Sequence, residues 1–308
     1  MKLFIDGKSG TTGLRILERI QNRSSVTLLT LSEEERKDTE RRRWALNACD
    51  VAILCLPDDA AREAVSLIEN PAVKVIDAST AHRTANGWAY GFPELGPSFR
   101  QSILSSNRIA LPGCYASGVI ALVYPLIEAG LLSPAARLSV HAISGYTGGG
   151  KKMIAEYEDA ERNPLLDAPR AYALTQTHKH LPEIQYITKL NTLPAFCPLV
   201  ADFDSGMLVT VPVFREDLTD GADAIRAVYQ NKYVGPIVTF NPDPAENGFM
   251  SAYGLHGLDR MEVSVAGNDD RILLMARFDN LGKGASGAAI QCLNLITGED
   301  ETEGLVLA

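Results

Sequence analysis

The sequence predicts an α/β protein that combines a doubly wound parallel sheet with an α+β domain whose sheet is mainly antiparallel. Three observations carry this prediction. Short apolar strand patterns alternate with helical patterns through the N-terminal part of the chain, as is typical of parallel βαβ units. A glycine-rich turn joins the first strand to the first helix. Several runs rich in β-branched residues follow in the C-terminal half, and these are expected to form antiparallel strands.

The composition is that of a globular protein with one large or two ordinary domains. The chain has 308 residues, of which 46% are hydrophobic and 22% are charged, and its net charge is -9. This acidic charge argues against a nucleic-acid partner. It leaves room for a local basic pocket that binds a phosphorylated small molecule.

The cysteines and the apolar segments bear on the compartment of the protein and on whether it crosses a membrane. Five cysteines are spread along the chain without a CxxC pair: Cys49, Cys55, Cys114, Cys197 and Cys292. This spacing predicts no disulfide framework and no bound metal, and it favours a reducing, cytoplasmic location. The chain opens without a long apolar secretory stretch. The uncharged segment 109–127 is interrupted by Pro112, Gly113, Gly118 and Pro125, which predicts a loop and a buried helix rather than a membrane span.

A cofactor-binding turn is predicted near the N-terminus. Residues 2–6 form an apolar strand, a GxxGxxG turn follows, and Leu14, Ile16, Leu17 and Ile20 give a helical stripe. In a Rossmann-type fold such glycines let the backbone approach a pyrophosphate at the helix N-terminus. The alternative is an ordinary tight turn. The expected cofactor-binding residues here are Gly7, Ser9, Gly10, Thr11, Thr12 and Gly13.

The end of the second predicted strand, residues 26–31, bears on the choice of cofactor. An NAD site commonly places an acidic residue at the end of this strand, whereas this chain has Ser32, with Arg36 close behind. A hydroxyl and nearby cations suit a 2′-phosphate, so NADP(H) is preferred and both residues are candidate ligands. The alternative is that residues 33–43 are a solvated, charged helix face.

Further strands are predicted at residues 50–56 and 73–77, and they extend the parallel sheet. The sequence Ser79-Thr80-Ala81-His82-Arg83 follows the second of them, at the edge where such sheets bind ligands. Arg83 is therefore a candidate for holding an anionic substrate group. An ordinary surface arginine is the alternative.

Cys114 is the predicted nucleophile. It lies in a Pro-Gly-Cys turn between a strand at 107–111 and a helix, where the helix dipole lowers a thiol pKa and favours the thiolate. The other four cysteines lie in apolar runs or in an apparent helix, as small buried hydrophobic residues do. A cysteine nucleophile beside a nicotinamide domain suggests hydride transfer to or from a carbon held on sulfur.

A second glycine-rich turn spans residues 145–152, after a strand at 138–143. It nearly matches the phosphate loop of kinases and ATPases, but Lys152 stands where a magnesium-binding hydroxyl is required. A kinase is therefore a minor alternative. Backbone N–H groups of this turn could still meet a substrate phosphate.

The segment 177–184 contains His178 and His180, with Glu183 close behind. No further ligands recur at zinc spacing, and in an extended segment the two histidines point to opposite faces. One of them is expected to activate the thiolate and to act as an acid. Glu183 is expected to orient an imidazole or to bind polar groups of the cofactor or substrate. His141 and His256 are interpreted as structural.

The remaining strands are predicted as the antiparallel sheet of the second domain. They lie at residues 205–214, 233–240, 261–266 and 272–278. A glycine-rich segment, 279–289, then opens a last helix, which fits a chain that returns to the first domain.

Four motifs together give a specific resemblance: the GxxGxxG turn, Ser79 to Arg83, Tyr90 to Leu95 (YGFPEL), and Pro112 to Ala116 (PGCYA). With the later His-x-His-x-Pro-Glu-Ile pattern, the chain resembles the N-acetyl-gamma-glutamyl-phosphate reductase family in its shorter, type 2 form. That family is related in fold to aspartate-semialdehyde dehydrogenase and glyceraldehyde-phosphate dehydrogenase. Family members often carry Asn before Pro-Gly-Cys, where this chain has Leu111; this departure leaves the nucleophile in place.

The resemblance implies an NADPH-dependent reduction of N-acetyl-L-glutamyl 5-phosphate to the 5-semialdehyde in arginine biosynthesis, through a thioacyl on Cys114. It implies His180 as the acid/base residue, with His178 as the close alternative. It also places Gly149 and Lys151 beside the substrate, and Asn280 and Gly284 near the nicotinamide.

The expected domains are an NADP-binding Rossmann domain, residues 1–112 and 284–308, and a catalytic and oligomerisation domain, residues 113–283. A homodimer or homotetramer is expected, and the ligands are a small acyl phosphate and inorganic phosphate. The rivals are an aspartate-semialdehyde dehydrogenase-type reductase of another acyl phosphate and a non-catalytic NADP(H) sensor.

Overall fold

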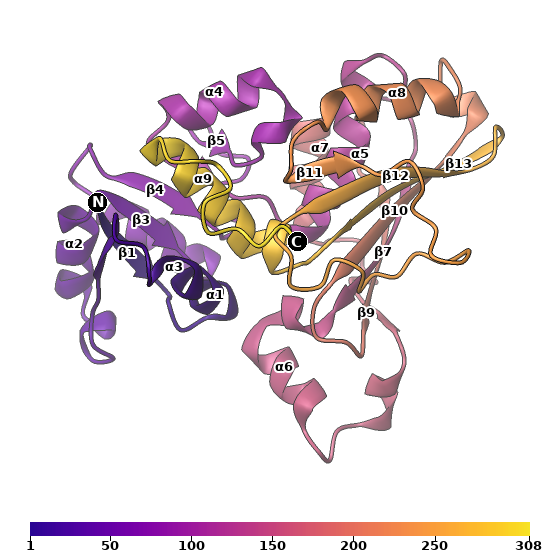
Figure 1. The fold of residues 1–308 in the computed structure, drawn as a ribbon. Helices are drawn as coiled ribbons and strands as arrows, with labels where there is room; N and C mark the ends of the chain where they lie inside the picture. The colour runs from indigo at the N-terminus through magenta and orange to yellow at the C-terminus, as the bar shows by residue number, and fades with distance from the viewer. The chain divides into compact units, whose positions relative to one another are not determined.

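The computed structural model describes residues 1–308, which divide into two compact units (Figure 1). The first unit contains residues 1–93, 97–112 and 285–305. The second contains residues 94–96, 113–284 and 306–308. The chain therefore leaves the first unit for three residues at Glu94 and again at Gly113, and it returns at Ala285.

The first unit is a parallel sheet in the order β2-β1-β3-β4-β6-β5, and every strand pair in it is parallel. The strands are β1 (Lys2–Asp6), β2 (Thr27–Leu29), β3 (Val51–Leu54), β4 (Lys74–Asp77), β5 (Ala89–Tyr90) and β6 (Arg108–Ala110). The helices are α1 (Thr11–Ile20), α2 (Thr39–Ala48), α3 (Asp58–Ser66), α4 (Pro97–Ser105) and α9 (Gly287–Thr297). All of β3 is buried, because helices cover both faces of such a sheet.

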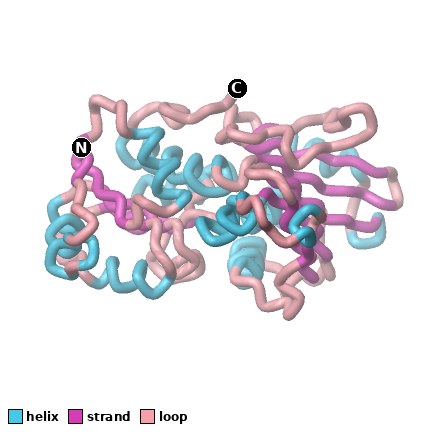
Figure 2. Tube along the Cα trace, turned by 90° about the horizontal axis from the view of Figure 1, so that it is seen from below, coloured by secondary structure: helices cyan, strands magenta, loops and turns pink.

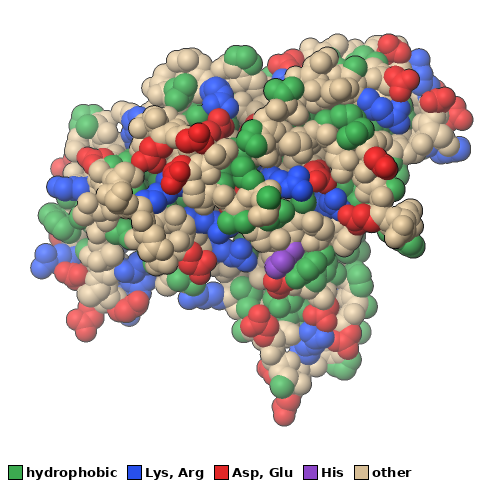
Figure 3. Space-filling view, viewed as in Figure 1, with side chains coloured by type: hydrophobic (Ala, Val, Ile, Leu, Met, Phe, Trp, Pro, Cys, Tyr) green, Lys and Arg blue, Asp and Glu red, His purple; other side chains and the backbone are tan.

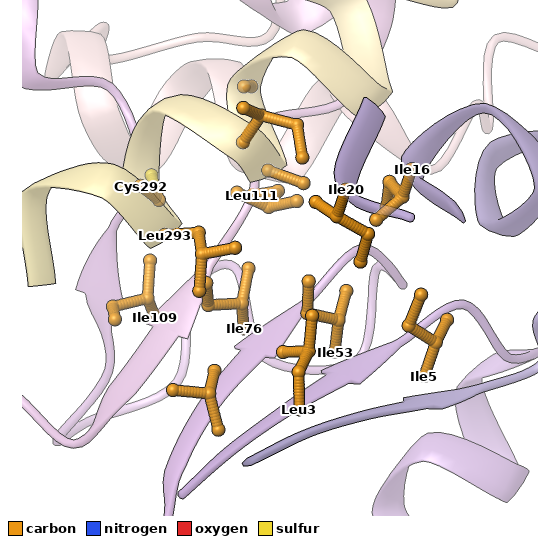
Figure 4. Packing of buried hydrophobic residues seen from close by; sticks show 14 of the residues in the cluster. Leu3, Ile5, Ile16, Ile20, Ile53, Ile76, Ile109, Leu111, Cys292 and Leu293 are labelled. Atoms are coloured by element: carbon orange, nitrogen blue, oxygen red, sulfur yellow. The ribbon is translucent and has the colours of Figure 1, made fainter. Parts of the chain in front are cut away.

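Two hydrophobic clusters hold this unit together, one on each face of the sheet. In Figure 4, α1 contributes Ile16 and Ile20, and α9 contributes Cys292 and Leu293, over strand residues such as Ile53. The opposite cluster lies under α2 and α3. Helices on both faces of a parallel sheet confirm the predicted doubly wound fold.

The second unit is a mixed sheet in the order β11-β12-β13-β10-β7-β9-β8. Its strands are β7 (Ser139–Gly145), β8 (Arg170–Ala171), β9 (Ala195–Ala201), β10 (Met207–Phe214), β11 (Val238–Phe240), β12 (Met261–Gly267) and β13 (Arg271–Phe278). The helices are α5 (Cys114–Glu128), α6 (Gly150–Glu158), α7 (His180–Thr188) and α8 (Ala222–Lys232). The long strands run side by side in Figure 2.

Most strand pairs of this sheet are antiparallel, as predicted, but two are not. β7 pairs with β9 in parallel, and β11 pairs with β12 in parallel. The predicted strand at 233–240 is wrong over most of its length, because Tyr233 ends helix α8 and only Val238–Phe240 is extended. Pro236 lies between the two elements, and it cannot donate a ladder hydrogen bond.

Helix α5 is the buried helix that was predicted from the uncharged segment. It packs against β10 and β13. A Cβ atom added at Gly118 would lie 2.6 Å from Val209 Cγ2, so only glycine allows this close approach. No helix of the structure combines the length and the apolar character needed to cross a membrane.

The other face of the second sheet is open and largely apolar. Val209, Val211 and Val213 of β10 are buried, whereas Leu208, Thr210 and Pro212, which alternate with them, are half-exposed. Side chains alternate in direction along a strand, so the half-exposed set shares one face. Its other apolar members include Ile143 of β7, Leu199 of β9, and Leu273 and Met275 of β13.

Candidate active site

The glycine-rich turn of the first unit has a geometry that requires glycine. Gly7 has φ +84°, and a Cβ atom there would overlap the carbonyl oxygen of Cys55. A Cβ atom at Gly13 would lie 2.7 Å from the Gly7 oxygen. Gly10 provides no side-chain cap for α1, and the first turn of α1 has no acidic residue. The positive end of this helix is therefore well suited to an anion.

Arg36 lies beside this turn. Its Nη1 donates to Ser9 Oγ at 3.1 Å, it pairs with Glu33, and its Nε is buried without a hydrogen-bond partner. An unpaired buried donor at the predicted phosphate site fits an anionic ligand. Ser32 makes local bonds instead, since its hydroxyl accepts from Glu35 N at 3.1 Å and its own N–H donates to the Glu35 carboxylate at 2.9 Å.

Two other arginines of the charged segment 33–43 have carboxylate partners from outside it. Arg42 contacts Asp6 at 3.0 Å, and Arg43 contacts Glu69 at 2.6 Å. Burial raises the pKa of Asp6 even though Arg42 acts in the opposite direction. On the face drawn in Figure 3, acidic and basic side chains are likewise intermixed. Of these arginines, Arg36 is the one that contacts the glycine-rich turn.

Arg83 is buried in the first unit, so the reading as an ordinary surface arginine does not apply. Its Nε donates to the Leu111 carbonyl at 2.8 Å, and its Nη2 donates to the Ala78 carbonyl at 3.2 Å. These two bonds join the end of β4 to the backbone that leads into Pro112. Arg83 therefore fixes the start of the Pro-Gly-Cys turn.

Cys114 is the first residue of α5, and Gly113 is its N-cap without a side-chain cap bond. The Gly113 N–H donates instead to Glu183 Oε1 at 2.8 Å. Glu183 is 2% exposed, so it is a buried acceptor that fixes the Pro-Gly-Cys turn. This contact joins residues 70 positions apart, and no local sequence pattern signals it.

The environments of the other cysteines differ from that of Cys114. Burial raises the pKa of Cys49 and Cys55 to about 12, so both stay protonated thiols at neutral pH. Cys292 is buried in the core of the first unit. Cys197 is exposed on β9.

The two histidines lie together rather than on opposite faces, which corrects the expectation of an extended segment. His180 begins helix α7, and its backbone N–H donates to His178 Nδ1 at 3.2 Å. The ring centroids are 4.6 Å apart, and each lies 6.0 Å from the Tyr115 ring. His178 is partly exposed, whereas His180 is buried. Because Tyr115 follows Cys114 directly, α5 and α7 bring the histidine pair to the first turn of the helix that begins at the cysteine.

Tyr172 is a site residue that the sequence analysis missed. Burial raises its pKa, a hydrogen bond with Tyr115 lowers it, and the nearby charge of Cys114 raises it. Its ring lies 5.9 Å from that of His178. A single tyrosine in an irregular segment has no sequence signature that could have identified it.

The second glycine-rich turn meets Asn280. Asn280 Oδ1 accepts from Gly206 N at 2.8 Å, and its Nδ2 donates to Thr147 Oγ1 at 3.2 Å. Gly149 and Lys151 are exposed at the start of α6. Both are accessible to a ligand, and no ion pair fixes Lys151.

Gly284 lies against the cysteine. A Cβ atom at Gly284 would be 3.1 Å from Cys114 Cβ, so the backbone at Gly284 fits closely against the nucleophile. Next to it, Lys283 Nζ donates to both carboxylate oxygens of Glu94, at 2.8 and 2.9 Å. The second unit therefore brings together the candidates Cys114, His178, His180, Glu183, Asn280 and Gly284.

Comparison with known proteins agrees with this geometry. Residues 2–102 match the family model "Semialdehyde dehydrogenase, NAD binding domain", and residues 114–280 match "Semialdehyde dehydrogenase, dimerisation domain". The N-acetyl-gamma-glutamyl-phosphate reductase of Burkholderia cenocepacia is 45% identical over 96% of this chain and 97% of its own. The N-acetyl-gamma-glutamyl-phosphate reductase 2 of Nostoc sp. is 43% identical to this chain, over 99% of both chains.

The chain belongs to the N-acetyl-gamma-glutamyl-phosphate reductase family. This confirms the resemblance drawn from the motifs. The reductase of Rhizobium meliloti is 45% identical over 96% of this chain and 98% of its own. Among solved structures, aspartate semialdehyde dehydrogenase from Francisella tularensis superimposes with a TM-score of 0.72 at 11% identity, covering 96% of this chain and 100% of its own. That likeness supports the predicted fold class, and the first unit is a nicotinamide-nucleotide-binding domain.

Proposed function

We propose that this chain is an NADPH-dependent reductase that converts N-acetyl-L-glutamyl 5-phosphate into N-acetyl-L-glutamate 5-semialdehyde and phosphate, a step of arginine biosynthesis. The observation that carries the proposal is Cys114 at the N-terminus of buried α5, where the rings of His178 and His180 lie against the next residue, Tyr115. The family membership supplies the substrate. A cysteine thiolate is a suitable nucleophile for an acyl phosphate. Covalent catalysis then divides one difficult displacement into two easier steps.

The residues of the second unit have distinct tasks in this reaction. The Cys114 thiolate attacks the acyl carbon, a C–S bond forms, and the C–O bond to phosphate breaks. The histidine takes the thiol proton and passes it to the departing phosphate. When bound, the nicotinamide cofactor supplies the hydride that reduces the carbon held on sulfur. The resulting oxyanion is hydrogen-bonded by the imidazole, and its collapse re-forms the carbonyl and expels the thiolate.

The partial exposure of His178 favours it over His180 as the proton-transfer residue. His178 can exchange its proton with solvent between turnovers, whereas His180 is buried. The His180 backbone N–H holds the His178 ring through Nδ1, which places the hydrogen of the neutral ring on Nε2; His178 takes up a proton when Nδ1 exchanges this contact for it. His180 is then a positioning residue.

The reaction is tested most simply in reverse. Pure protein is mixed with N-acetyl-glutamate semialdehyde, phosphate and NADP⁺, and absorbance of the reduced cofactor is followed. A phosphate-dependent signal supports the proposal. A signal obtained only with aspartate semialdehyde would assign the chain to a different acyl phosphate, and cofactor binding without any turnover would favour a sensor.

Arg36 is proposed to select NADP(H). Replacing Arg36 with alanine is expected to raise the KM for NADPH about 10-fold or more and to change the KM for NADH less than about 2-fold, because a charge-assisted bond to the 2′-phosphate is lost. Initial rates with both cofactors provide the measurement. Arg43→Ala, which removes an arginine paired with Glu69, is the matched control. Equal loss with both cofactors would mean that Arg36 only supports the Ser9 turn.

The open face of the second sheet is proposed to pack against a second copy of the chain. It is apolar and belongs to the segment that matches a dimerisation domain. Light scattering is expected to give twice the chain mass of 33.3 kDa, and Leu208→Glu is expected to give a monomer, since a buried unpaired charge is costly. Leu165→Glu, at a residue that is 72% exposed, is the control. A Leu208→Glu dimer would place the interface elsewhere.

A further inference from the structure

His82 is a histidine whose side chain is held firmly by its neighbours, and the proposed mechanism assigns it no role. It lies in the turn after β4 and is 9% exposed. Its Nδ1 is 2.6 Å from Asp77 Oδ2, and its ring stacks on Trp88 at a centroid distance of 4.1 Å and an angle of 9°. A carboxylate and an indole therefore fix both the orientation and the plane of this imidazole.

The hydrogen bonds of Asp77 assign the tautomer. Asp77 is fully buried, and it also accepts from the Ser79 backbone N–H at 2.9 Å and from Ser79 Oγ at 2.7 Å. An ionised carboxylate only accepts, so His82 Nδ1 carries a hydrogen. Nε2 has no protein hydrogen-bond partner, and it is not sealed from solvent. The outward nitrogen is thus the one that a ligand can reach.

The turn that carries His82 is anchored on its outer side as well. Thr80 N donates to Asp58 Oδ1 at 2.9 Å, and the Thr80 hydroxyl bonds the same carboxylate. Arg62 Nη1 donates to the Ala81 carbonyl at 3.0 Å. Since α3 holds the turn from both of these points, the imidazole is preorganised, as a binding group should be.

The register of the sheet places this group along the edge where a dinucleotide lies. Asp6 pairs with Leu54, and Leu54 pairs with Asp77, so these three residues form one row at the carboxyl ends of the strands. Gly7 follows Asp6, and Asp77 is two strand spacings away, or roughly 10 Å. Arg36 lies on the β2 side, which receives the adenosine half. The nicotinamide half therefore extends towards β4.

We propose that His82 is a further cofactor-contact residue, whose Nε2 hydrogen-bonds a ribose hydroxyl in the nicotinamide half of the bound dinucleotide. The proposal rests on the proposed function only in its need for a nicotinamide cofactor. The imidazole accepts from the hydroxyl while Asp77 holds its opposite nitrogen. It fixes the ribose, and with it the direction of the nicotinamide ring.

Binding to two ligands tests the proposal. In a Trp44→Phe background, Trp88 is the one tryptophan left, because the chain has two, and its fluorescence reports binding beside His82. His82→Asn keeps a donor for Asp77 and removes Nε2. It is expected to weaken NADP⁺ binding about 5- to 10-fold and to leave unchanged the affinity for 2′-phospho-ADP, which lacks the nicotinamide ribose. His82→Gln, with an amide near the Nε2 position, is expected to recover part of the loss.

Each other outcome has a separate meaning. Unchanged NADP⁺ affinity in His82→Asn overturns the proposal, and so does an equal loss for both ligands, which would show a purely structural role. If the parent protein binds neither ligand, the cofactor assignment of the proposed function fails first. Calorimetric titration of both ligands gives the same comparison should Trp88 report no change.

Discussion

Cys114→Ser is expected to lower kcat at least about 10³-fold, while the Kd for NADP⁺ changes less than about 2-fold. Losses of this size are usual when a nucleophile is removed. A serine hydroxyl has the same place at the start of α5, but the helix N-terminus cannot ionise it at neutral pH. Affinity for the cofactor is unaffected because the glycine-rich turn and Arg36 belong to the first unit.

The measurement combines turnover with thiol labelling. Cys114 is expected to react with iodoacetamide faster than free cysteine at the same pH, because the α5 N-terminus stabilises its thiolate. Cys49 and Cys55, whose pKa values are raised to about 12, should react slowly. Cys197→Ser is the matched control and should keep full activity. Substantial turnover by Cys114→Ser would exclude a thioacyl intermediate.

Local patterns were sufficient for the main elements of the first unit. The strand, glycine turn and helix at residues 2–20 are set by neighbours in sequence, so apolar spacing and the glycine positions predict them. The Pro-Gly-Cys sequence likewise predicted the start of a helix, and α5 begins at Cys114. The second unit was harder, because β11 is only three residues long and its parallel pairing with β12 depends on a distant strand.

Contacts between distant residues account for what the sequence did not predict. The segment 33–43 could be read only as a set of nearby cations or as a solvated helix face, because the partners of Arg42 and Arg43, Asp6 and Glu69, come from other elements. Glu183 was expected to orient an imidazole or to bind ligand groups, and its acceptance of the Gly113 N–H appears only when α7 packs on α5. The histidine segment was expected to be extended, whereas α7 begins at His180 and brings the rings together.

The second large effect is expected from the histidine pair. His178→Gln should lower kcat by about 10²- to 10⁴-fold, the usual contribution of a general acid–base residue. It should also slow Cys114 alkylation at neutral pH, because no imidazole remains to take the thiol proton. His180→Gln should lower kcat less and should keep the pH dependence, since its backbone N–H to His178 Nδ1 survives the substitution.

The pH dependence of kcat separates these two roles in a way that a loss of activity does not. A residue that transfers the proton gives an inflection that disappears when it is replaced, whereas a residue that only positions its neighbour lowers the rate and leaves the inflection. Because the rings are 4.6 Å apart, protonation of one imidazole disfavours protonation of the other, and a single inflection is expected between them. If that inflection is lost in His180→Gln and kept in His178→Gln, the buried histidine transfers the proton. The partly exposed one would then connect it to solvent.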